Sequence, residues 1–256
     1  MFTIILSCAG TLQEHKRWYK LKKKIELCKD RKNMKQVIKE GKCIVIGAGD
    51  LTVNRLDYNS ETDYLIAVDG GIMYCPILEV EPDLIIGDFD SVNREWKEAI
   101  QKIQENVPEK VEMLCPEKDD TDMYAALKRG LEAGYRNFRI YGATGGRVEH
   151  TIANIQCLLF LKHQDAVGYI MDGGGMMLVL ENESISFRKE MEGYLSVFSL
   201  GKEAKGITLK GLKYTLDDYT MTNDYPIGIS NEFIGETAEI SVKDGKILVI
   251  VSWVQE

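Results

Sequence analysis

The stretch that decides the fold is Asp83-Leu84-Ile85-Ile86-Gly87-Asp88-Phe89-Asp90-Ser91, an apolar run that leads into two carboxylates. We expect a buried strand at residues 84–87 and an extended chain after it. Side chains alternate along an extended segment, so Asp88 and Asp90 should share one side while Phe89 faces the other. Such a pair can hold Mg²⁺, which is usually bound by one or two carboxylates together with substrate phosphates. A purely structural alternative is that Asp90 or Ser91 caps the helix expected from about Asn93.

Polar loops follow three other predicted strands. These loops are Ala67-Val68-Asp69-Gly70-Gly71, Pro116-Glu117-Lys118-Asp119-Asp120-Thr121-Asp122 and Gly142-Ala143-Thr144-Gly145-Gly146-Arg147-Val148-Glu149-His150. In an open parallel sheet, ligands bind at the carboxyl ends of the strands. We therefore expect these loops and the first stretch to build one composite site.

Short apolar runs alternate with helical periods from residue 43 to about residue 172. Strands are predicted at 43–48, 64–68, 84–87, 111–114, 138–141 and 167–171, and helices at 94–104, 122–133 and 149–161. This alternation predicts an α/β fold with a mostly parallel sheet and helices on both faces. After Gly173-Gly174-Gly175 only short strand-like runs remain, which predicts a small antiparallel β-sandwich domain. These runs are 177–180, 184–187, 195–200, 206–209, 237–242 and 247–253. The expected domains are therefore residues 41–173 and 174–256.

Composition and charge narrow the class of protein. Hydrophobic residues make up 45% and charged residues 28%, as in ordinary globular proteins. Residues 1–40 carry 11 Lys and Arg against 4 Asp and Glu, whereas residues 41–256 carry 21 against 36. This acidic body argues against nucleic acid as a partner, because phosphate backbones are bound by clustered positive charge. No apolar run has the length of a membrane-spanning helix, so no membrane partner is expected.

The basic segment 1–40 is interpreted as an N-terminal extension, either a surface helix or a flexible arm. Met34 is an alternative natural start, because it lies shortly before the first convincing strand. The opening residues lack the basic region of a secretory signal. The six cysteines show neither a CxxC motif nor zinc-type spacing, which favours a reducing compartment. We therefore expect a cytoplasmic protein.

The glycine-rich segments favour neither an NAD enzyme nor a Walker-type kinase, but two of them could bind phosphate through backbone N–H groups. Gly47-Ala48-Gly49 lacks the third glycine of the dinucleotide fingerprint, and the chain has no GxxxxGK[ST] motif. Asp69-Gly70-Gly71 is either a plain turn or a place where backbone N–H groups approach a phosphate. Gly145-Gly146-Arg147 precedes a helix, whose free N–H groups form an anion site, and the planar guanidinium of Arg147 suits phosphate.

The segment Lys118-Asp119-Asp120-Thr121-Asp122 stands at the start of a predicted helix. Asp120 or Thr121 can cap that helix, and acidic residues suit the positive end of its dipole. Capping accounts for one or two acidic residues. A site for Mg²⁺ and phosphate accounts for all four charges.

Taken in order, these segments resemble those of thiamine pyrophosphokinases. The resemblance runs from about Cys43 to the C-terminus through GDFDS, KDxTD, GGRxxH and a later Ser230-Asn231-Glu232. It implies an α/β domain followed by a β-sandwich, and transfer of the diphosphoryl group of ATP to the hydroxyl of thiamine, giving thiamine diphosphate and AMP. It also implies Mg²⁺ as cofactor and a homodimer with thiamine sites at the interface.

The resemblance implies roles for individual residues. Metal binding and catalysis fall to Asp88, Asp90 and Asp122, with Arg147 as a further catalytic residue. ATP binding falls to Asp69, Gly70, Gly71, Lys118, Asp119, Thr121, Gly145, Gly146, Arg147 and His150. Thiamine binding falls to Ser230, Asn231 and Tyr214, although a strand tyrosine is more often packed than stacked on a ligand. The chain departs from the family where Glu149 replaces the usual Asp and Tyr214 the common Trp.

Three other functions remain open. A pterin pyrophosphokinase would share the GDFDS loop and the chemistry, but Ser230-Asn231-Glu232 favours thiamine as acceptor. A metal-dependent nucleotide-sugar glycosyltransferase also uses an Asp-x-Asp pair, but it gives no role to KDDTD or GGRVEH. A non-catalytic thiamine-binding module would not need charged loops gathered at one edge of a sheet.

Overall fold

The computed structural model describes residues 38–115, 117 and 119–253. The proposed extension at residues 1–40, with its alternative start at Met34, therefore lies almost wholly outside the described residues, and so does Lys118. In the part of the chain that is described, no helix has both the length and the apolar character needed to cross a membrane.

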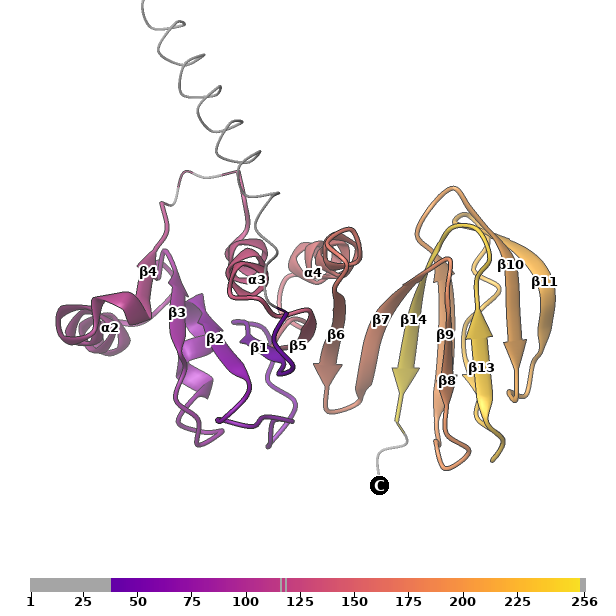
Figure 1. The fold of residues 1–256 in the computed structure, drawn as a ribbon, viewed down its shortest axis with the longest axis horizontal. Coiled ribbons are helices and arrows are strands. Elements are labelled where there is room, and N and C mark those ends of the chain that lie inside the picture. Colours follow the sequence, from indigo (N-terminus) through magenta and orange to yellow (C-terminus); the bar gives the residue numbers. More distant parts are fainter. Residues whose placement is uncertain (1–37, 116, 118, 254–256) are drawn as a thin grey trace, which may run out of the picture. The chain divides into compact units, whose positions relative to one another are not determined.

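Parallel strands form the first part of a large sheet, in the order β6-β5-β1-β2-β3-β4 (Figure 1). They are β1 (Cys43–Ile46), β2 (Tyr64–Val68), β3 (Leu84–Gly87), β4 (Val111–Met113), β5 (Asn137–Tyr141) and β6 (Val167–Asp172). In register, Ile46 at the end of β1 pairs with Ala67 of β2 and with Tyr141 of β5. Neighbouring strands thus end close together, and the loops that follow them share one edge of the sheet.

Helical segments cover both faces of these strands. They are α2 (Arg94–Asn106), α3 (Asp122–Glu132) and α4 (Val148–Lys162), with the 3-10 segments η1 (Asp69–Tyr74) and η2 (Pro108–Lys110). Along β1, Cys43 and Val45 share a core with α3 and α4, whereas Ile44 and Ile46 share one with α2 and η1. Burial on both faces explains why the strands are continuous apolar runs. The predicted parallel sheet with helices on both faces is confirmed.

Antiparallel strands extend the same sheet beyond β6, in the order β7-β14-β9-β12. They are β7 (Gly175–Glu181), β9 (Tyr194–Ser199), β12 (Asn231–Glu232) and β14 (Lys246–Ser252). A separate antiparallel sheet has the order β11-β10-β13-β8, formed by β8 (Ser184–Phe187), β10 (Glu203–Lys210), β11 (Leu216–Thr222) and β13 (Ala238–Ser241). Leu178 and Val249 of the large sheet share a core with Ile207 and Ile240 of the small one. The predicted β-sandwich is therefore present.

The two parts of the fold join at a tight turn between β6 and β7. Asp172 pairs with Gly175 across this turn, so the sheet continues through the proposed boundary at Gly173–Gly175. A Cβ on Gly173 would lie 2.1 Å from the carbonyl oxygen of Thr52, and one on Gly175 would lie 1.9 Å from that of Val251. Only glycine fits such close approaches. The proposed domains 41–173 and 174–256 would thus share one sheet and differ in strand direction. Val179 of β7 and Leu248 of β14 pack into the same core as α3 and α4, so the cores are not separate.

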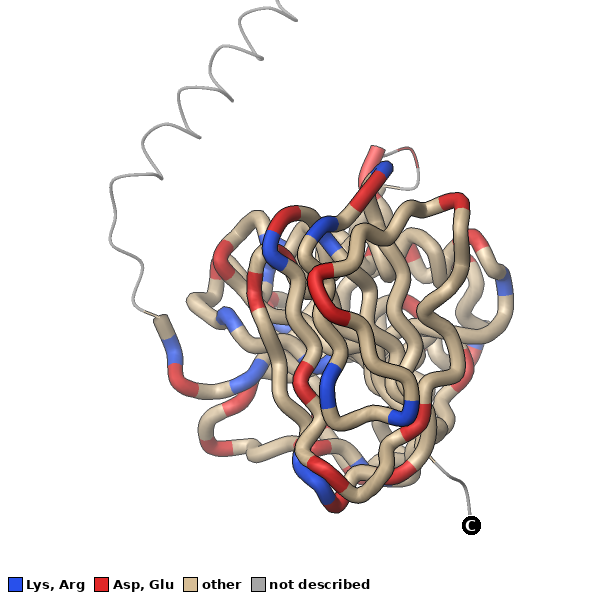
Figure 2. Tube along the Cα trace, turned by 90° about the vertical axis from the view of Figure 1, so that its right-hand side faces the viewer, with Lys and Arg blue, Asp and Glu red and all other residues tan. Residues whose placement is uncertain are grey.

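Figure 2 shows Lys and Arg interspersed with Asp and Glu over the side of the molecule that carries β10 and β11. Lys205 forms an ion pair of 2.7 Å with Glu203, and Lys243 forms one of 2.6 Å with Asp218. Exposed pairs of this kind stabilise a fold only weakly, because water and salt screen the charges. The buried core between the sheets, more than these ion pairs, holds this region together.

Candidate active site

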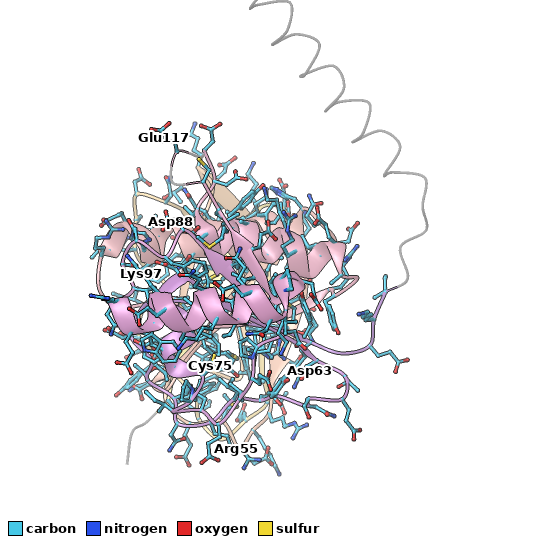
Figure 3. The ribbon with its side chains drawn as sticks, turned by 90° about the vertical axis from the view of Figure 1, so that its left-hand side faces the viewer. Arg55, Asp63, Cys75, Asp88, Lys97 and Glu117 are labelled. Atoms are coloured by element: carbon cyan, nitrogen blue, oxygen red, sulfur yellow. The ribbon has the colours of Figure 1, made fainter. Side chains whose placement is uncertain are left out.

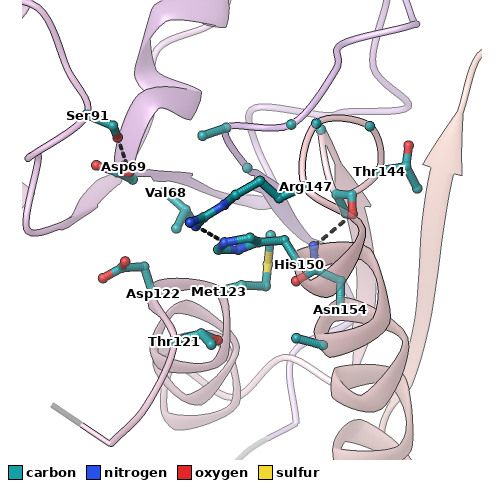
Figure 4. A pocket seen from close by; sticks show the side chains of 18 residues that line it. Val68, Asp69, Ser91, Thr121, Asp122, Met123, Thr144, Arg147, His150 and Asn154 are labelled. Carbon is teal, nitrogen blue, oxygen red and sulfur yellow. Dashed lines mark hydrogen bonds between the residues drawn. The ribbon is translucent and has the colours of Figure 1, made fainter.

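A cavity of about 420 Å³ lies at the carboxyl ends of the parallel strands. The strand order reverses between β1 and β5, because the chain runs outward from β1 to β4 and then returns to place β5 on the other side of β1. Such a reversal is where open α/β sheets bind ligands. The cavity, drawn in Figure 4, is lined by Gly47, Ala48, Gly49, Val68, Asp69, Ser91, Thr121, Asp122, Met123, Gly142, Ala143, Thr144, Gly145, Gly146, Arg147, His150, Ala153 and Asn154. The structure thus brings all the loops of the predicted composite site to one cavity.

Two glycine loops form one wall of the cavity, one after β1 and one after β5. They lie back to back, with a hydrogen bond of 2.8 Å from Gly49 N to Gly142 O and another of 2.8 Å from Asp50 N to Thr144 O. A Cβ on Gly49 would lie 2.3 Å from Thr144 O. These glycines allow two backbones to approach each other at the edge of a ligand cavity.

The segment Gly145-Gly146-Arg147 leads into α4 as the sequence predicts. Gly145 and Gly146 have positive φ angles of 79° and 57°, and the N-cap residue Arg147 makes no side-chain capping hydrogen bond. The N-terminal N–H groups of α4 are thus available to an anion. In Figure 4 the guanidinium of Arg147 points into the cavity, where its Nη2 contacts Nε2 of His150. Glu149, the departure from the family pattern, is exposed and lies 3.4 Å from Arg147 Nε.

A cluster of three carboxylates adjoins the cavity. One oxygen from each of Asp69, Asp88 and Asp90 lies within 4.8 Å of the other two. Asp69 Oδ2 accepts a hydrogen bond of 2.7 Å from Ser91 Oγ. Burial raises the pKa of Asp69, and the charges of Asp122, Asp88 and Asp90 add to this effect, while the Ser91 hydrogen bond opposes it. Negative charge is therefore concentrated here, and a bound cation would reduce the repulsion between the carboxylates.

The expected extended chain through Asp88 and Asp90 is not what brings these carboxylates together. β3 ends at Gly87, and Phe89 has a positive φ of 57° with its ring buried in the core. Asp90 N donates to Asp88 Oδ1 at 3.1 Å, so the two acids meet in a tight turn. A positive φ is uncommon for a bulky residue, and such strain is often found at functional sites.

The structural alternative for Asp90 and Ser91 fails, because α2 is capped by another residue. Asn93 Oδ1 accepts the capping hydrogen bond from Trp96 N at 3.0 Å. Ser91 instead binds Asp69, and Asp90 belongs to the acidic cluster. Figure 3 shows Lys97 of α2 on the same side as Asp88, and Lys97 Nζ donates to the backbone oxygen of Asp90 at 3.2 Å.

The residues of the predicted KDDTD segment have different roles in the structure. Thr121 caps α3 by accepting a hydrogen bond of 3.2 Å from Tyr124 N, which fixes one of the two capping candidates. Asp120 forms an ion pair with Lys128. Asp122 lines the cavity but does not belong to the three-carboxylate cluster, and Asp119 is exposed and does not line the cavity.

The two glycines after Asp69 have a packing role. Gly70 and Gly71 are buried in η1 and do not line the cavity. A Cβ on Gly71 would lie 2.1 Å from Ile46 O, so glycine here lets η1 pack on the end of β1. Asp69 itself lines the cavity and has a positive φ of 49°.

The predicted thiamine residues meet in the β region, apart from the cavity lining. Asn231 is buried, and its amide binds the backbone of Tyr214 twice: Oδ1 accepts from Tyr214 N at 2.9 Å, and Nδ2 donates to Tyr214 O at 2.6 Å. Ser230 is exposed with a positive φ of 55°, and the Tyr214 side chain is 62% exposed. Asn231 thus fixes the backbone that presents the Tyr214 ring to solvent.

The sequence interpretation missed the place of Asp69 in the acidic cluster. The signal lies in strand adjacency, because β2 and β3 pair with Val68 opposite Ile86, which sets Asp69 beside Gly87 and Asp88. A Cβ on Gly87 would lie 3.0 Å from Asp69 Cα, so Gly87 permits this approach. Asn154 was also missed; it is buried and donates to Ala143 O at 2.8 Å, which ties the glycine loop to α4.

An open α/β sheet with a glycine loop, a free helix N-terminus and an acidic cluster at its switch point is an arrangement typical of nucleotide-binding enzymes. Comparison with known proteins makes the class specific. A family model described as "Thiamin pyrophosphokinase, catalytic domain" matches residues 56–170, and one described as "Thiamin pyrophosphokinase, vitamin B1 binding domain" matches residues 182–247. The chain belongs to the thiamine pyrophosphokinase family.

Individual relatives agree with this assignment. The thiamine pyrophosphokinase of Bacillus subtilis is 28% identical over 207 residues, which is 80% of this chain and 95% of the relative. The crystal structure of thiamine pyrophosphokinase from Bacillus subtilis matches with a TM-score of 0.74 and 27% identity, covering 84% of this chain and 100% of that one. The crystal structure of thiamin pyrophosphokinase from Geobacillus thermodenitrificans matches with a TM-score of 0.71 and 29% identity, covering 84% and 99%.

Proposed function

We propose that the protein is a thiamine diphosphokinase, which transfers the diphosphoryl group of ATP to the hydroxyl of thiamine and yields thiamine diphosphate and AMP. The observation that carries this function is the presence of both matched regions, catalytic and vitamin B1 binding, in one chain. The cavity supports it, because an anion site at Gly145-Gly146-Arg147 stands with an acidic cluster at the same sheet edge. The pterin and glycosyltransferase alternatives have no comparable support.

We assign the triphosphate of ATP to the loop Gly145-Gly146-Arg147 and the N-terminus of α4. Arg147 offers a bidentate donor, and His150 beside it lines the same cavity. Thr121 and Asp122 line the side of the cavity nearest α3. Lys118 and Asp119 are assigned to the nucleotide from the sequence, together with Gly70 and Gly71 as backbone support.

We propose that Mg²⁺ is held by Asp88 and Asp90 with Asp69, and that Asp122 completes the site around the phosphates. The residues present fit such an ion: within the described chain, Asp69 Oδ1 is buried and has no hydrogen-bond partner, although its neighbours are other carboxylates. Carboxylate oxygens are the ligands that Mg²⁺ prefers. When bound, the ion would neutralise phosphate charge and help to align the reacting oxygens.

In the proposed reaction the thiamine hydroxyl oxygen bonds to the β-phosphorus of ATP, and the bond from that phosphorus to the α-phosphate oxygen breaks. AMP leaves with the bridging oxygen, and the hydroxyl proton passes to a carboxylate of the cluster. Arg147 stabilises the charge that develops on the transferred group. Transfers of this kind depend mainly on positioning and charge stabilisation, which the fixed loops of this cavity supply.

We assign thiamine to Ser230, Asn231 and Tyr214, and propose a homodimer that places this surface at the interface. β12 lies at the edge of the large sheet, where unpaired backbone groups invite contact with another chain. Large apolar side chains are exposed on the chain around it, namely Tyr194, Tyr214, Tyr225, Ile227, Ile229 and Ile234. Exposed apolar clusters mark interaction sites.

We also propose a cytoplasmic location. Cys43, Cys75 and Cys157 are buried free thiols and Cys115 is an exposed one, which suits a reducing compartment.

The function is tested by incubating the protein with ATP, Mg²⁺ and a panel of thiamine and pterin alcohols. AMP and thiamine diphosphate should accumulate together, with no ester from the pterins. A pterin diphosphate would favour the alternative acceptor. Thiamine binding without consumption of ATP would favour a non-catalytic module.

A further inference from the structure

Asp172, the last residue of β6, lies behind the wall of the cavity. Its Oδ2 accepts a hydrogen bond of 2.9 Å from Thr144 Oγ1, and its Oδ1 accepts one of 2.9 Å from Gly174 N. The hydroxyl of Thr52 adjoins the same carboxylate and helps to lower its pKa. Thr144 lines the cavity, whereas Asp172 does not. Asp172 can therefore act on a ligand only through its neighbours.

Three separate segments meet at this carboxylate. Thr52 belongs to the segment after β1, Thr144 to the loop after β5, and Gly174 to the turn between β6 and β7. Thr52 Oγ1 also accepts a hydrogen bond of 2.8 Å from Gly173 N. One charged side chain thus ties the glycine loop after β5 both to the neighbouring loop and to the start of the β region.

The loop after β5 needs such a contact because its own sequence does not fix its shape. Gly142 and Gly145 have positive φ angles of 57° and 79°, and glycine explores both signs of φ freely. Thr144 between them is held on one side by the hydrogen bond from Asp50 N to its carbonyl oxygen, at 2.8 Å. Its hydroxyl is held on the other side by Asp172.

The charge of Asp172 strengthens this contact. Burial raises the pKa of Asp172, but hydrogen bonds from Gly174, Thr144 and Thr52 outweigh burial and hold that pKa below its usual value. The group is therefore a carboxylate at neutral pH. Hydrogen bonds to an ionised acceptor are stronger than neutral ones.

We propose that Asp172 is a positioning residue for nucleotide binding, which holds the loop Gly142–Gly146 through Thr144 in the shape that presents Arg147 and the backbone N–H groups to the phosphates. The inference rests on the proposed function, because it takes the cavity to be the ATP site. It assigns Asp172 no contact with either substrate.

A double-mutant cycle tests this inference in the full chain. The variants are Asp172→Asn, Thr144→Val and the two combined, and the measurements are KM for ATP, KM for thiamine, kcat and Tm. Asp63→Asn is the matched control, because Asp63 also accepts two backbone hydrogen bonds, from Lys42 N at 2.8 Å and Asn59 N at 2.9 Å. Asp63 precedes β2, at the end away from the cavity, and Figure 3 shows it well apart from Asp88.

Each single variant should raise KM for ATP roughly tenfold, as expected for loss of one hydrogen bond to a charged group, and change KM for thiamine little. The double variant should be no worse than the worse single one, because both remove the same contact. Thr144→Ser keeps the hydroxyl and should lie closer to the parent than Thr144→Val. Asp63→Asn should lower Tm without changing KM for ATP.

Two results would overturn the inference. Asp172→Asn could lower Tm as Asp63→Asn does and leave KM for ATP within about twofold of the parent. Alternatively, the effects of Asp172→Asn and Thr144→Val could add, which would mean that Thr144 acts on the nucleotide by itself. If Asp172→Asn does not fold, equal KM values for Thr144→Val and Thr144→Ser would refute the inference. If the parent binds ATP but forms no thiamine diphosphate, the proposed function fails, and the same cycle measured by ATP-binding calorimetry still decides the role of Asp172.

Discussion

Replacing Asp69 by Asn should make the metal-free protein more stable and the enzyme far less active. Asn keeps the size of the side chain and an oxygen that can accept the hydrogen bond from Ser91 Oγ. It also tolerates the positive φ of 49° at this position, which alanine would not do as well. The substitution therefore removes one charge and little else.

The magnitude follows from the spacing of the cluster. Oxygens of Asp69, Asp88 and Asp90 lie within 4.8 Å of one another, so without a cation each charge pair is repulsive. At that distance two unit charges repel by about 1 kcal/mol in a water-like medium and by about 3 kcal/mol at an effective dielectric constant near 20. Asp69→Asn removes two of these repulsions and weakens one hydrogen bond to Ser91. A net gain of about 1 kcal/mol in the free energy of unfolding corresponds to a rise in Tm of roughly 2–4 °C for a chain of this size.

Thermal unfolding in EDTA and in Mg²⁺ measures both sides of this expectation. The parent should be stabilised by Mg²⁺, by about 1.4 kcal/mol at ten times the dissociation constant, and Asp69→Asn should lose most of this response. Activity should fall by about 10²–10³. A variant that is less stable than the parent in EDTA and still fully active would show that Asp69 is a structural group and not a metal ligand. Asp63→Asn removes a buried carboxylate that accepts two backbone hydrogen bonds away from the cluster, and it is the control for loss of a structural carboxylate. It should lower Tm equally in EDTA and in Mg²⁺.

Three further expectations follow from the same contacts. Asp90→Asn should fold normally and lose a factor of about 10²–10³ in rate at limiting Mg²⁺. The double change of Asp88 and Asp90 to Asn should cost little more, since both act through one ion. Near-normal activity of Asp90→Asn would remove it from the metal site. Asn93→Ala removes the cap of α2 and should lower the free energy of unfolding by about 1 kcal/mol with kcat retained, so a loss of activity at full stability would contradict the capping assignment. Asn231→Ala frees the backbone of Tyr214 and should raise KM for thiamine roughly tenfold to a hundredfold with little change in KM for ATP, and an equal effect on both substrates would move Asn231 out of the thiamine site.

The order of elements could be predicted because the strands are buried on both faces. Cys43–Ile46 and Leu84–Gly87 are fully buried apolar runs, and the helix starts at Arg94 and Asp122 follow capping residues. By contrast, β11 and β12 escaped prediction because their residues are mostly polar or exposed, and β12 is only two residues long. The continuity of the sheet through Gly173-Gly174 was also missed, since sequence runs do not reveal which strands pair.

The candidate site could be predicted as a set of loops but not as a set of contacts. Asp88 and Asp90 do meet, although through a turn at Phe89 and not through an extended chain. The position of Asp69 beside them depends on the pairing of β2 with β3, which local patterns do not contain. Likewise, nothing near Asp172 in the sequence announces its hydrogen bond to Thr144, 28 residues away.

The fate of labelled phosphorus decides whether this chain moves a diphosphoryl group in a single step. The protein is incubated with thiamine, Mg²⁺ and ATP labelled at the β-phosphorus, and the products are separated. The label should appear in thiamine diphosphate while an equal amount of unlabelled AMP is released, and Asp69→Asn should slow both together. Labelled ADP with unlabelled thiamine monophosphate as the first products would contradict transfer in a single step.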